Sequence, residues 1–461
     1  MSAHLTTDFV AREMEARGYR VIAGPVVDIT GGTADSRQVA PGDLFCAFPG
    51  ERTHGDRFVA DALAAGAVAA ICSTPPDPVP PGKTIVVAPD TTRAVGELAR
   101  AWRLACGPRV VGVTGTVGKT TAKDLAAAAL SRHFRVFSRR GNYNSREGLP
   151  LALLGLRRDH EVAVLEIAMD TRGEIAYLAG IALPEIGGVM NVGLTHVEKV
   201  GSIEAIAEEK LSLARALPAD GTAILNMDDP RIAPEAARLA CRVIGFGRPG
   251  PGVDLAFSGE AARSLEGSTF IASFRGETVT VQSPLPGLHT IPAALFAIAA
   301  GIALGLTFPE AAAAVSAAEL PERRITIRRS DTGATLLDDR YNSSPASLAG
   351  ALRLLAMATG GRRIAFLGKM AELGEHEEAE HRAAGRIAAE CCDILFAIGE
   401  TCRSMAEEAR ALGHPDVRWF DDKYEAARAL RELLGPGDTV LLKASRSQAF
   451  EDVIPLLEGE P

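Results

Sequence analysis

The sequence predicts an α/β protein of three domains, and three observations support this. The chain has 461 residues, which is too long for one ordinary core and enough for roughly three domains. From about residue 109 onward, short apolar runs alternate with polar loops and helical stretches, which is typical of a mostly parallel sheet wrapped by helices. One apolar run passes through a glycine-rich loop into an alanine-rich helix. We expect a small α/β domain over 1–106, a central domain over 107–320 and a Rossmann-like α/β domain over 321–461.

The N-terminal domain is predicted from helix and turn patterns. Residues 1–19 intersperse charged and apolar side chains, as an amphipathic helix does and a signal peptide does not. The segment 33–37 leads into an apolar run at 39–45, and a helix is expected over 57–66. The prolines between residues 75 and 82 indicate a loop.

The other two domains are predicted from apolar runs of strand length. In the central domain these are residues 110–113, 162–167, 186–192 and 223–225, with one alanine-rich helix expected over 292–318. In the third domain they are residues 335–337, 363–367, 394–398 and 439–442. Ligands of open α/β sheets bind at the carboxyl ends of strands, so we look for a site just past these runs.

Composition narrows the range of partners and locations. The net charge is −9 and no long Lys/Arg run is present, which argues against a nucleic-acid partner. No apolar run is long enough to span a bilayer. The seven cysteines have no CxxC or paired metal spacing, as expected of buried thiols in a reducing compartment. We therefore expect a cytoplasmic protein that acts on small molecules.

The glycine loop is the most informative feature of the chain. Its functional residues are Gly115, Thr116, Gly118, Lys119, Thr120 and Thr121. Backbone amides of such a loop and the following helix N-terminus converge on phosphates, so the loop predicts ATP or GTP binding. Lys119 would bridge the terminal phosphates and Thr120 would hold Mg²⁺. Val113 stands where the generic P-loop has its first glycine, so a plain strand-to-helix turn is the alternative.

Further candidates follow the next strands. Glu166 ends an apolar strand, where a carboxylate needs a cation. His196 comes after the next strand and Asn191, and together with Glu166 it suits a second Mg²⁺ site. Taken alone, His196 is more often a structural loop histidine, and Glu166 is a plain surface strand end. Lys210 lies among glutamates on a predicted helix, and taken alone it is a solvated lysine.

These residues resemble the Mur ligases, a family of ATP-dependent enzymes that build the peptide of peptidoglycan. The loop 115–121 matches the version of the P-loop found in that family, which accounts for Val113. Further matches extend the resemblance over nearly the whole chain, and they are residues 35–37, 41–45, 141–144, 173–175, 191–193, 338–342, 370–374 and 443–447.

The resemblance implies an ADP-forming amide ligation that requires Mg²⁺. The closest likeness is to the members that add D-alanyl-D-alanine to UDP-N-acetylmuramoyl-tripeptide through an acyl phosphate. Residues 341–345 favour this acceptor. The alternatives are a diverged ligase that joins another carboxylate and amine, and a nucleotide-binding module without ligase activity.

The resemblance also assigns roles to residues. Thr120, Glu166, His196 and Lys210 would serve the metal ions, with Lys210 carbamylated. ATP would be bound by the loop, Asn191, Arg323 and Asp339. The other substrates would be bound by Ser36, Arg37, Asn142, Asn144, Tyr341, Asn342, Lys443 and Arg446. A monomer is the default expectation.

The chain departs from the family pattern at several positions. Ala293 replaces an asparagine that usually helps to recognise adenine, which puts the nucleotide preference in doubt. Lys369 stands where the family has an aspartate, which reverses a charge near the expected substrate. Both departures would suit a relative that joins different substrates.

Overall fold

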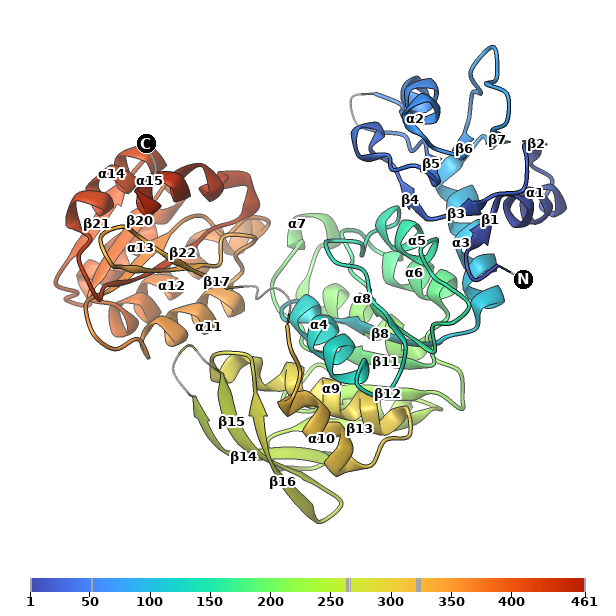
Figure 1. The fold of residues 1–461 in the computed structure, drawn as a ribbon. Helices are drawn as coiled ribbons and strands as arrows, with labels where there is room; N and C mark the ends of the chain where they lie inside the picture. Colours follow the sequence, from blue (N-terminus) through green and yellow to red (C-terminus); the bar gives the residue numbers. More distant parts are fainter. Residues whose placement is uncertain (1, 51–52, 263–264, 266, 321–324, 460–461) are drawn as a thin grey trace.

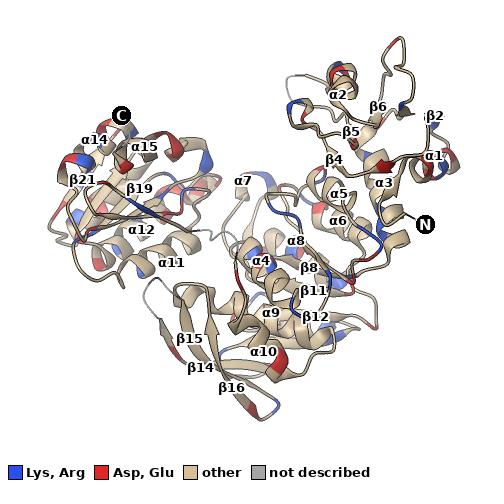
Figure 2. Cartoon of the chain, viewed as in Figure 1, with Lys and Arg blue, Asp and Glu red and all other residues tan. Residues whose placement is uncertain are grey.

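The chain folds into three α/β units, which are an N-terminal, a central and a C-terminal unit. A computed structural model describes residues 2–50, 53–262, 265, 267–320 and 325–459. Each unit has its own sheet with helices packed on it, and the N-terminal and C-terminal units both adjoin the central unit (Figure 1). Lysine, arginine, aspartate and glutamate are interspersed over all three units (Figure 2). Among the described helices, none is both long and apolar enough to cross a membrane.

The N-terminal unit contains a five-stranded sheet of order β2-β7-β6-β5-β4. Only the edge strand β2 runs antiparallel to its neighbour. The strands are β1 Leu5–Thr6, β2 Arg20–Ile22, β3 Asp28–Ile29, β4 Gly31–Thr33, β5 Asp43–Cys46, β6 Ala69–Cys72 and β7 Thr84–Val87. The helices are α1 Thr7–Ala16, η1 Ser36–Gln38, η2 Gly55–Phe58, α2 Val59–Ala65 and α3 Thr91–Cys106. The expected helices at 1–19 and 57–66 are thus present but shorter.

Helix α3 joins the N-terminal unit to the central one. Asp90 caps its first turn by accepting from the Arg93 amide at 2.9 Å. The Trp102 ring is 1% exposed, and its Nε1 donates to the Leu156 carbonyl at 3.0 Å. Arg103 Nε donates to the Ala182 carbonyl at 2.8 Å. Buried apolar residues of both units form one continuous cluster around this helix.

The central unit contains a nine-stranded sheet of order β16-β15-β14-β13-β12-β11-β8-β10-β9. The strands from β9 to β14 pair in parallel, as predicted, whereas β14, β15 and β16 form an antiparallel extension that the sequence analysis missed. The strands are β8 Arg109–Thr114, β9 Val136–Phe137, β10 Val162–Glu166, β11 Ile186–Val189, β12 Thr222–Asn226, β13 Arg242–Gly247, β14 Leu255–Ala262, β15 Ser268–Phe274 and β16 Glu277–Ser283.

Helices cover both faces of the central sheet. They are α4 Lys119–Leu130, α5 Gly148–Leu153, α6 Glu174–Ala182, α7 Val197–Val200, α8 Ile203–Arg215, η3 Ala233–Arg238, η4 Leu288–Thr290, α9 Ile291–Ala303 and α10 Phe308–Ser316. The α4, α9 and α10 helices pack in one apolar cluster, and α5, α6 and α8 pack in the other. The prediction of one helix over 292–318 was wrong. Thr307 and Glu310 form a capping box that starts α10 anew after the turn at Gly305.

The C-terminal unit contains a six-stranded sheet of order β17-β18-β22-β19-β20-β21, parallel except for β17. The strands are β17 Thr326–Arg329, β18 Thr335–Asp338, β19 Arg363–Leu367, β20 Ile394–Ile398, β21 Val417–Phe420 and β22 Thr439–Lys443. The helices are α11 Pro345–Leu355, η5 Gly374–His376, α12 Glu377–Cys391, η6 Glu400–Cys402, α13 Arg403–Ala411, α14 Lys423–Leu433, η7 Arg446–Gln448, η8 Phe450–Val453 and α15 Ile454–Glu458. The α11, α12 and α13 helices cover one face, and α14 and α15 cover the other.

Candidate active site

The glycine loop has the predicted form of strand, loop and helix. It runs from β8 into α4, and Gly118 is the residue before the first helical turn, with φ of +84°. Gly115 has φ of +157°, and a Cβ there would lie 2.8 Å from Met190 Cβ. Both positions therefore need glycine. The amides at the N-terminus of α4 lack helical partners, so the loop can bind an anion there.

Asn191 holds the loop in shape from the neighbouring strand. Its Oδ1 accepts from the amides of Thr116 at 3.0 Å and Val117 at 2.8 Å, and its Nδ2 donates to the Val117 carbonyl at 2.8 Å. Lys119 Nζ donates to the carbonyls of Gly115 at 2.8 Å and Thr116 at 3.2 Å. The ammonium group is thus held over the loop, where a phosphate would meet it.

Glu166 is buried beside the loop helix. It is 5% exposed at the end of β10. Its Oε2 accepts from Thr120 Oγ1 at 2.5 Å, and its Oε1 accepts from Asn144 Nδ2 at 2.7 Å. Asn144 Nδ2 also donates to Asn142 Oδ1 at 3.0 Å. A hydroxyl and a carboxylate beside a phosphate-binding loop are oxygen ligands of the kind that Mg²⁺ prefers.

Lys210 is buried, not solvated. Its side chain lies on α8 and is 2% exposed. Burial, and secondarily the positive charge of Lys119, lower the pKa of Lys210 well below its ordinary value, although Glu209 opposes this. Glu209 itself accepts from the amides of Gly173 at 2.7 Å and Ile175 at 2.8 Å, at the start of α6. Burial therefore makes the charged form of this amine less favourable than it is in water.

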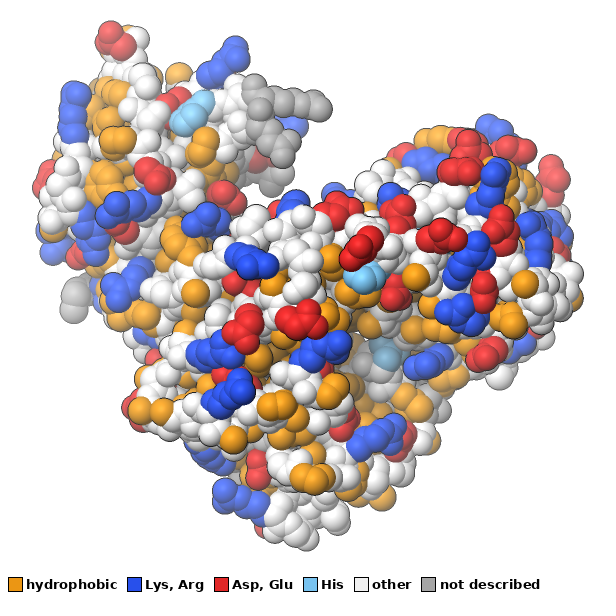
Figure 3. Space-filling model, turned by 180° about the vertical axis from the view of Figure 1, so that it is seen from behind, with side chains coloured by type: hydrophobic (Ala, Val, Ile, Leu, Met, Phe, Trp, Pro, Cys, Tyr) orange, Lys and Arg blue, Asp and Glu red, His pale blue; other side chains and the backbone are white. Residues whose placement is uncertain are grey.

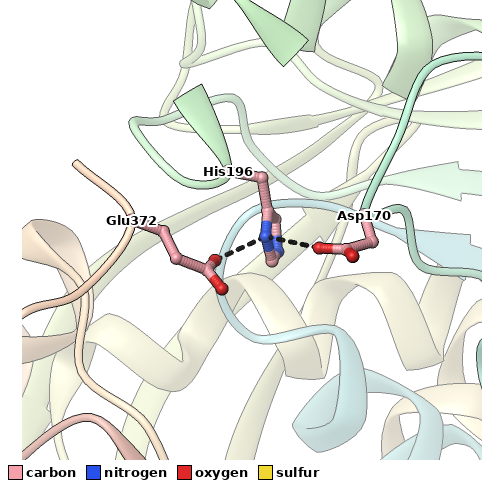
Figure 4. A group of neighbouring side chains, drawn as sticks. All are labelled: Asp170, His196 and Glu372. Carbon is pink, nitrogen blue, oxygen red and sulfur yellow. Dashed lines mark ion pairs between the residues drawn. The ribbon is translucent and has the colours of Figure 1, made fainter. Parts of the chain in front are cut away.

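His196 meets two carboxylates, one of them from the C-terminal unit (Figure 4). Its Nδ1 lies 3.2 Å from Asp170 Oδ1 and 2.5 Å from Glu372 Oε2. The hydrogen bond with His196 lowers the pKa of Glu372 below its usual range. The three side chains offer ligand atoms within 4.8 Å of one another. In the described part of the chain, no hydrogen bond or ion pair joins His196 to Glu166.

A pocket between the central and C-terminal units adjoins the loop. We call it the interdomain pocket, and the residues that line it include Thr116, Gly118, Thr121, Asn191, His289, Ala293, Asp339, Asn342 and Lys443. Lys443 is 2% exposed, and its Nζ donates to Asp339 Oδ2 at 2.7 Å and to the Asn342 carbonyl at 2.9 Å. Burial lowers the pKa of His289. Leu285, Pro286, Leu320 and Ile325 add an apolar wall that could face a nucleobase.

The remaining candidates lie apart from this pocket. Ser36 and Arg37 form the short helix η1, where Arg37 is exposed and pairs with Asp35 at 2.8 Å. A cavity beside η1, between the N-terminal and central units, is lined by Gly32, Gln38, Arg139, Arg140 and Tyr143 among others. Tyr341 and Arg446 line a pocket of the C-terminal unit. Arg323 lies outside the described residues.

Sequence reasoning did not select the carboxylates around His196. Asp170 lies shortly after β10, and Glu372 lies in the segment 370–374 that had suggested the family, but neither position reveals its partner. Lys369 pairs with Glu377 at 2.8 Å, so its charge is met within the C-terminal unit.

Seen from behind, acidic and basic side chains gather where the central and C-terminal units meet, and a notch separates the N-terminal from the C-terminal unit (Figure 3).

Comparison with known proteins gives consistent matches along the chain. Residues 28–103 match the Mur ligase family catalytic domain, residues 113–301 the Mur ligase middle domain, and residues 323–446 the Mur ligase glutamate ligase domain. Two curated relatives are named UDP-N-acetylmuramoyl-tripeptide--D-alanyl-D-alanine ligase. The one from Bacillus subtilis is 33% identical over 94% of each chain. The one from Synechocystis is 36% identical over 92% of this chain and 91% of its own.

Solved structures agree with these matches. MurF from Acinetobacter baumannii superposes with a TM-score of 0.87 and 27% identity over 100% of both chains. MurF ligase from Thermotoga maritima in complex with ADP has a TM-score of 0.80 and 27% identity, over 93% of this chain and 97% of its own.

Proposed function

The chain belongs to the Mur ligase family, and from this premise we propose that it joins D-alanyl-D-alanine to UDP-N-acetylmuramoyl-tripeptide in an ATP-dependent, ADP-forming reaction of peptidoglycan precursor synthesis. The observation that supports this most strongly is the match to ligases of that name over more than nine-tenths of the chain. The phosphate-binding loop supports the ATP dependence, since it opens onto a pocket shared with the C-terminal unit.

The chemistry requires activation because a carboxylate is a poor electrophile. A tripeptide carboxylate oxygen attacks the γ-phosphorus of ATP, so that an O–P bond forms and ADP leaves. The amine of D-alanyl-D-alanine then attacks the carbonyl carbon of the acyl phosphate, phosphate leaves and the amine loses a proton. Negative charge accumulates on phosphoryl oxygens in both steps, so electrostatic stabilisation and positioning provide most of the catalysis.

The loop residues are suited to the first step. The Lys119 ammonium, now held by the carbonyls of Gly115 and Thr116, would turn to the terminal phosphates. Amides at the start of α4 would bind the same oxygens. Thr120 and Glu166 would hold Mg²⁺, whose positive charge offsets the charge of the phosphates when it is bound. The contact between Thr120 and Glu166, with Asn144 on the other carboxylate oxygen, supports this role.

Lys210 and His196 would serve a second metal ion. A buried ammonium next to Lys119 has the wrong sign for a metal site, whereas an uncharged amine can react with CO₂ to form an anionic carbamate. The burial of Lys210 and its lowered pKa support that modification. His196 would contribute an imidazole from the start of α7, where Asp170 and Glu372 orient it.

The C-terminal unit would complete the nucleotide site. Asp339 is held by Lys443, so its carboxylate can accept from a ribose hydroxyl. Ala293 leaves the base without the amide expected from the family, and the apolar wall of the pocket would provide the contact instead. By family resemblance, Arg323 would contact the phosphates. Enclosure between two units would keep water from the acyl phosphate.

The UDP-sugar end of the substrate would lie toward the N-terminal unit. The cavity beside η1 supports this, and it is lined by Gln38 of η1 and by Arg139, Arg140 and Tyr143 of the loop past β9. By family resemblance, the neighbouring residues Ser36, Arg37, Asn142 and Asn144 would contact the substrate. Such substrates are small soluble metabolites, which suits an enzyme of the cytoplasm. A monomer is the default oligomeric state in this proposal.

The test is phosphate release from ATP with UDP-N-acetylmuramoyl-tripeptide, with and without D-alanyl-D-alanine, followed by mass analysis of the product. We expect release that depends on both substrates and a UDP-N-acetylmuramoyl-pentapeptide product. A folded protein that binds nucleotide but forms no pentapeptide would contradict the proposal.

A further inference from the structure

A fully buried histidine of the C-terminal unit lies outside the site described above. His381 is on α12 and is 0% exposed. Its Nδ1 lies 2.7 Å from the Glu377 carbonyl oxygen, and its Nε2 lies 3.1 Å from the Met370 amide nitrogen. A carbonyl can only accept and an amide can only donate, so Nδ1 carries the proton and Nε2 is the acceptor. The two bonds therefore require a neutral imidazole of one tautomer.

The amide that donates to His381 belongs to a loop that reaches the central unit. We call residues 368–374, which follow β19, the docking loop. Its Glu372 side chain lies against His196 (Figure 4), and the Glu372 carbonyl accepts from the Val197 amide at 3.3 Å. Glu372 has φ of +63°, a conformation that is unfavourable for a residue with a side chain and persists only where surrounding contacts hold it.

His381 holds the docking loop two residues before Glu372. Met370, whose amide donates to the ring, is itself 0% exposed. The next amide along, that of Ala371, donates to Ser445 Oγ at 2.8 Å. The loop is thus held by α12 and by the segment after β22. Without the His381 acceptor, a buried amide would be left unpaired, which costs free energy, and the chain next to Glu372 would lose a fixed point.

Two charged groups act on the ring, Glu377 of its own helix and Lys369 of the docking loop. Burial lowers the pKa of His381 below its ordinary value, the hydrogen bond to Glu377 and the charge of Glu377 oppose this, and the positive charge of Lys369 adds to it. Lys369 stands where the family pattern has an aspartate, and a negative charge there would favour protonation of the ring. The departure at residue 369 therefore suits a histidine that has to stay neutral.

We propose that His381 is a positioning residue that, as a neutral imidazole, holds the docking loop in the form that presents Glu372 to His196. This inference rests on the proposed function, in which His196 and the C-terminal unit take part. The UDP-sugar end of the substrate would lie toward the N-terminal unit, away from the docking loop, so His381 should affect turnover and not the binding of that substrate. Protonation would turn Nε2 into a donor facing the Met370 amide, and the loop would lose its hold.

The test uses two amide side chains that each copy one ring nitrogen. Glutamine places its amide near the position of Nε2, and asparagine places its amide near that of Nδ1. His381→Gln therefore keeps an acceptor for the Met370 amide, whereas His381→Asn loses it. For His381→Asn, we expect kcat for pentapeptide formation to fall about 5- to 150-fold, the range for a buried amide left unpaired, with an unchanged KM for UDP-N-acetylmuramoyl-tripeptide. His381→Gln should recover most of the turnover.

A matched control is His414→Asn. His414 lies in the same unit and also bonds to the backbone through both ring nitrogens, since Nε2 donates to the Cys392 carbonyl at 2.9 Å and Nδ1 accepts from the Asp416 amide at 3.3 Å. These partners precede β20 and β21, at the opposite end of the parallel sheet from the docking loop. We expect kcat to be unchanged. The inference would be overturned if His381→Asn kept full turnover, or if His381→Gln lost as much as His381→Asn.

A double-mutant comparison tests the route through Glu372. Glu372→Gln should lower kcat, and His381→Asn should add little to that loss, because both changes act on one contact. Fully additive losses would show that His381 acts elsewhere and would overturn the inference.

An independent readout needs no destabilising variant. The ¹⁵N NMR signals of labelled histidine report which ring nitrogen is protonated, and their loss in His381→Gln identifies those of His381. At pH 8 we expect a neutral ring with its proton on Nδ1, and a charged ring or a proton on Nε2 would overturn the inference. An unmodified protein that has this ring state but forms no pentapeptide would contradict the proposed function alone.

Discussion

Single residues in this protein are positioned by contacts from more than one element. Lys119 begins α4, Glu166 ends β10 and Lys210 comes from α8, yet Thr120 bonds to Glu166, and burial together with the charge of Lys119 lowers the pKa of Lys210. The loop and strand positions were predictable, because strand ends are marked by apolar runs. The burial of Lys210 was not predictable from its glutamate neighbours, because burial depends on the packing of α8.

The first prediction concerns Lys119. Lys119→Ala should lower kcat by about 10²- to 10³-fold, the range for removing one group that stabilises developing charge. Its ammonium donates to the loop carbonyls of Gly115 and Thr116, so the change should act on the loop and leave the thermal unfolding midpoint close to that of the unmodified protein. Lys83→Ala is the control, since Lys83 Nζ also donates to a backbone carbonyl, of Ala67, but in the N-terminal unit. Near-full turnover of Lys119→Ala would refute the phosphate assignment.

The second prediction concerns the thiols. Burial raises the pKa of Cys392 and of Cys402 to about 12, and it raises the pKa of the other five thiols as well. A raised pKa keeps a thiol protonated at pH 8, and only the thiolate reacts rapidly. A disulfide reagent at pH 8 should therefore react slowly with the native protein. After denaturation, the same reagent should react with all seven cysteines. Rapid reaction of one thiol in the native protein would contradict this.

At the scale of elements, the sequence predicted the parallel strands better than the antiparallel hairpin strands and the boundary between α9 and α10. The expected strands at 110–113, 363–367 and 394–398 coincide with β8, β19 and β20, because a strand buried on both faces is apolar throughout. The hairpin strands β15 and β16 alternate buried and exposed residues, so they lack that run. The split between α9 and α10 was marked by Thr307 and Glu310, but the alanine composition on either side concealed it.

The third prediction tests packing between β11 and α9. A Cβ added at Gly188 would lie 2.2 Å from Phe296 Cε2, so Gly188→Ala should destabilise the protein by about 1–3 kcal/mol, as overpacked cores do. Gly180→Ala on α6 is the control. A Cβ there meets nothing within 4 Å, and alanine favours a helix over glycine by up to about 1 kcal/mol. Thermal unfolding should therefore shift downward for the first variant and not for the second. Equal midpoints would argue against this packing.

At the scale of the whole molecule, the three units are joined in different ways. The N-terminal unit shares a buried apolar cluster with the central unit through α3. The C-terminal unit meets α7 through polar contacts, which include Glu372 with His196 and the Gly374 amide with Glu198 at 3.3 Å. Polar contacts of partly exposed groups are weak, so we expect the C-terminal unit to be the one that moves.

The fourth prediction tests that contact. Glu372→Gln removes the carboxylate that lies against His196 Nδ1, so the C-terminal unit should separate more readily and the radius of gyration of the nucleotide-free protein should rise. Small-angle X-ray scattering would measure it. Glu375→Gln is the control on the same segment, because the Glu375 side chain is 89% exposed. Identical scattering from both variants and the unmodified protein would show that the pair does not hold the units together.

The central claim is that the tripeptide carboxylate is activated by phosphoryl transfer before the amine attacks. The most direct measurement uses UDP-N-acetylmuramoyl-tripeptide labelled with ¹⁸O in the reacting carboxylate, with ATP and D-alanyl-D-alanine, and mass analysis of the phosphate released. The attacking carboxylate oxygen stays on phosphorus when the acyl phosphate breaks down, so we predict one ¹⁸O atom in each phosphate formed with pentapeptide. Pentapeptide formed together with unlabelled phosphate would contradict the account.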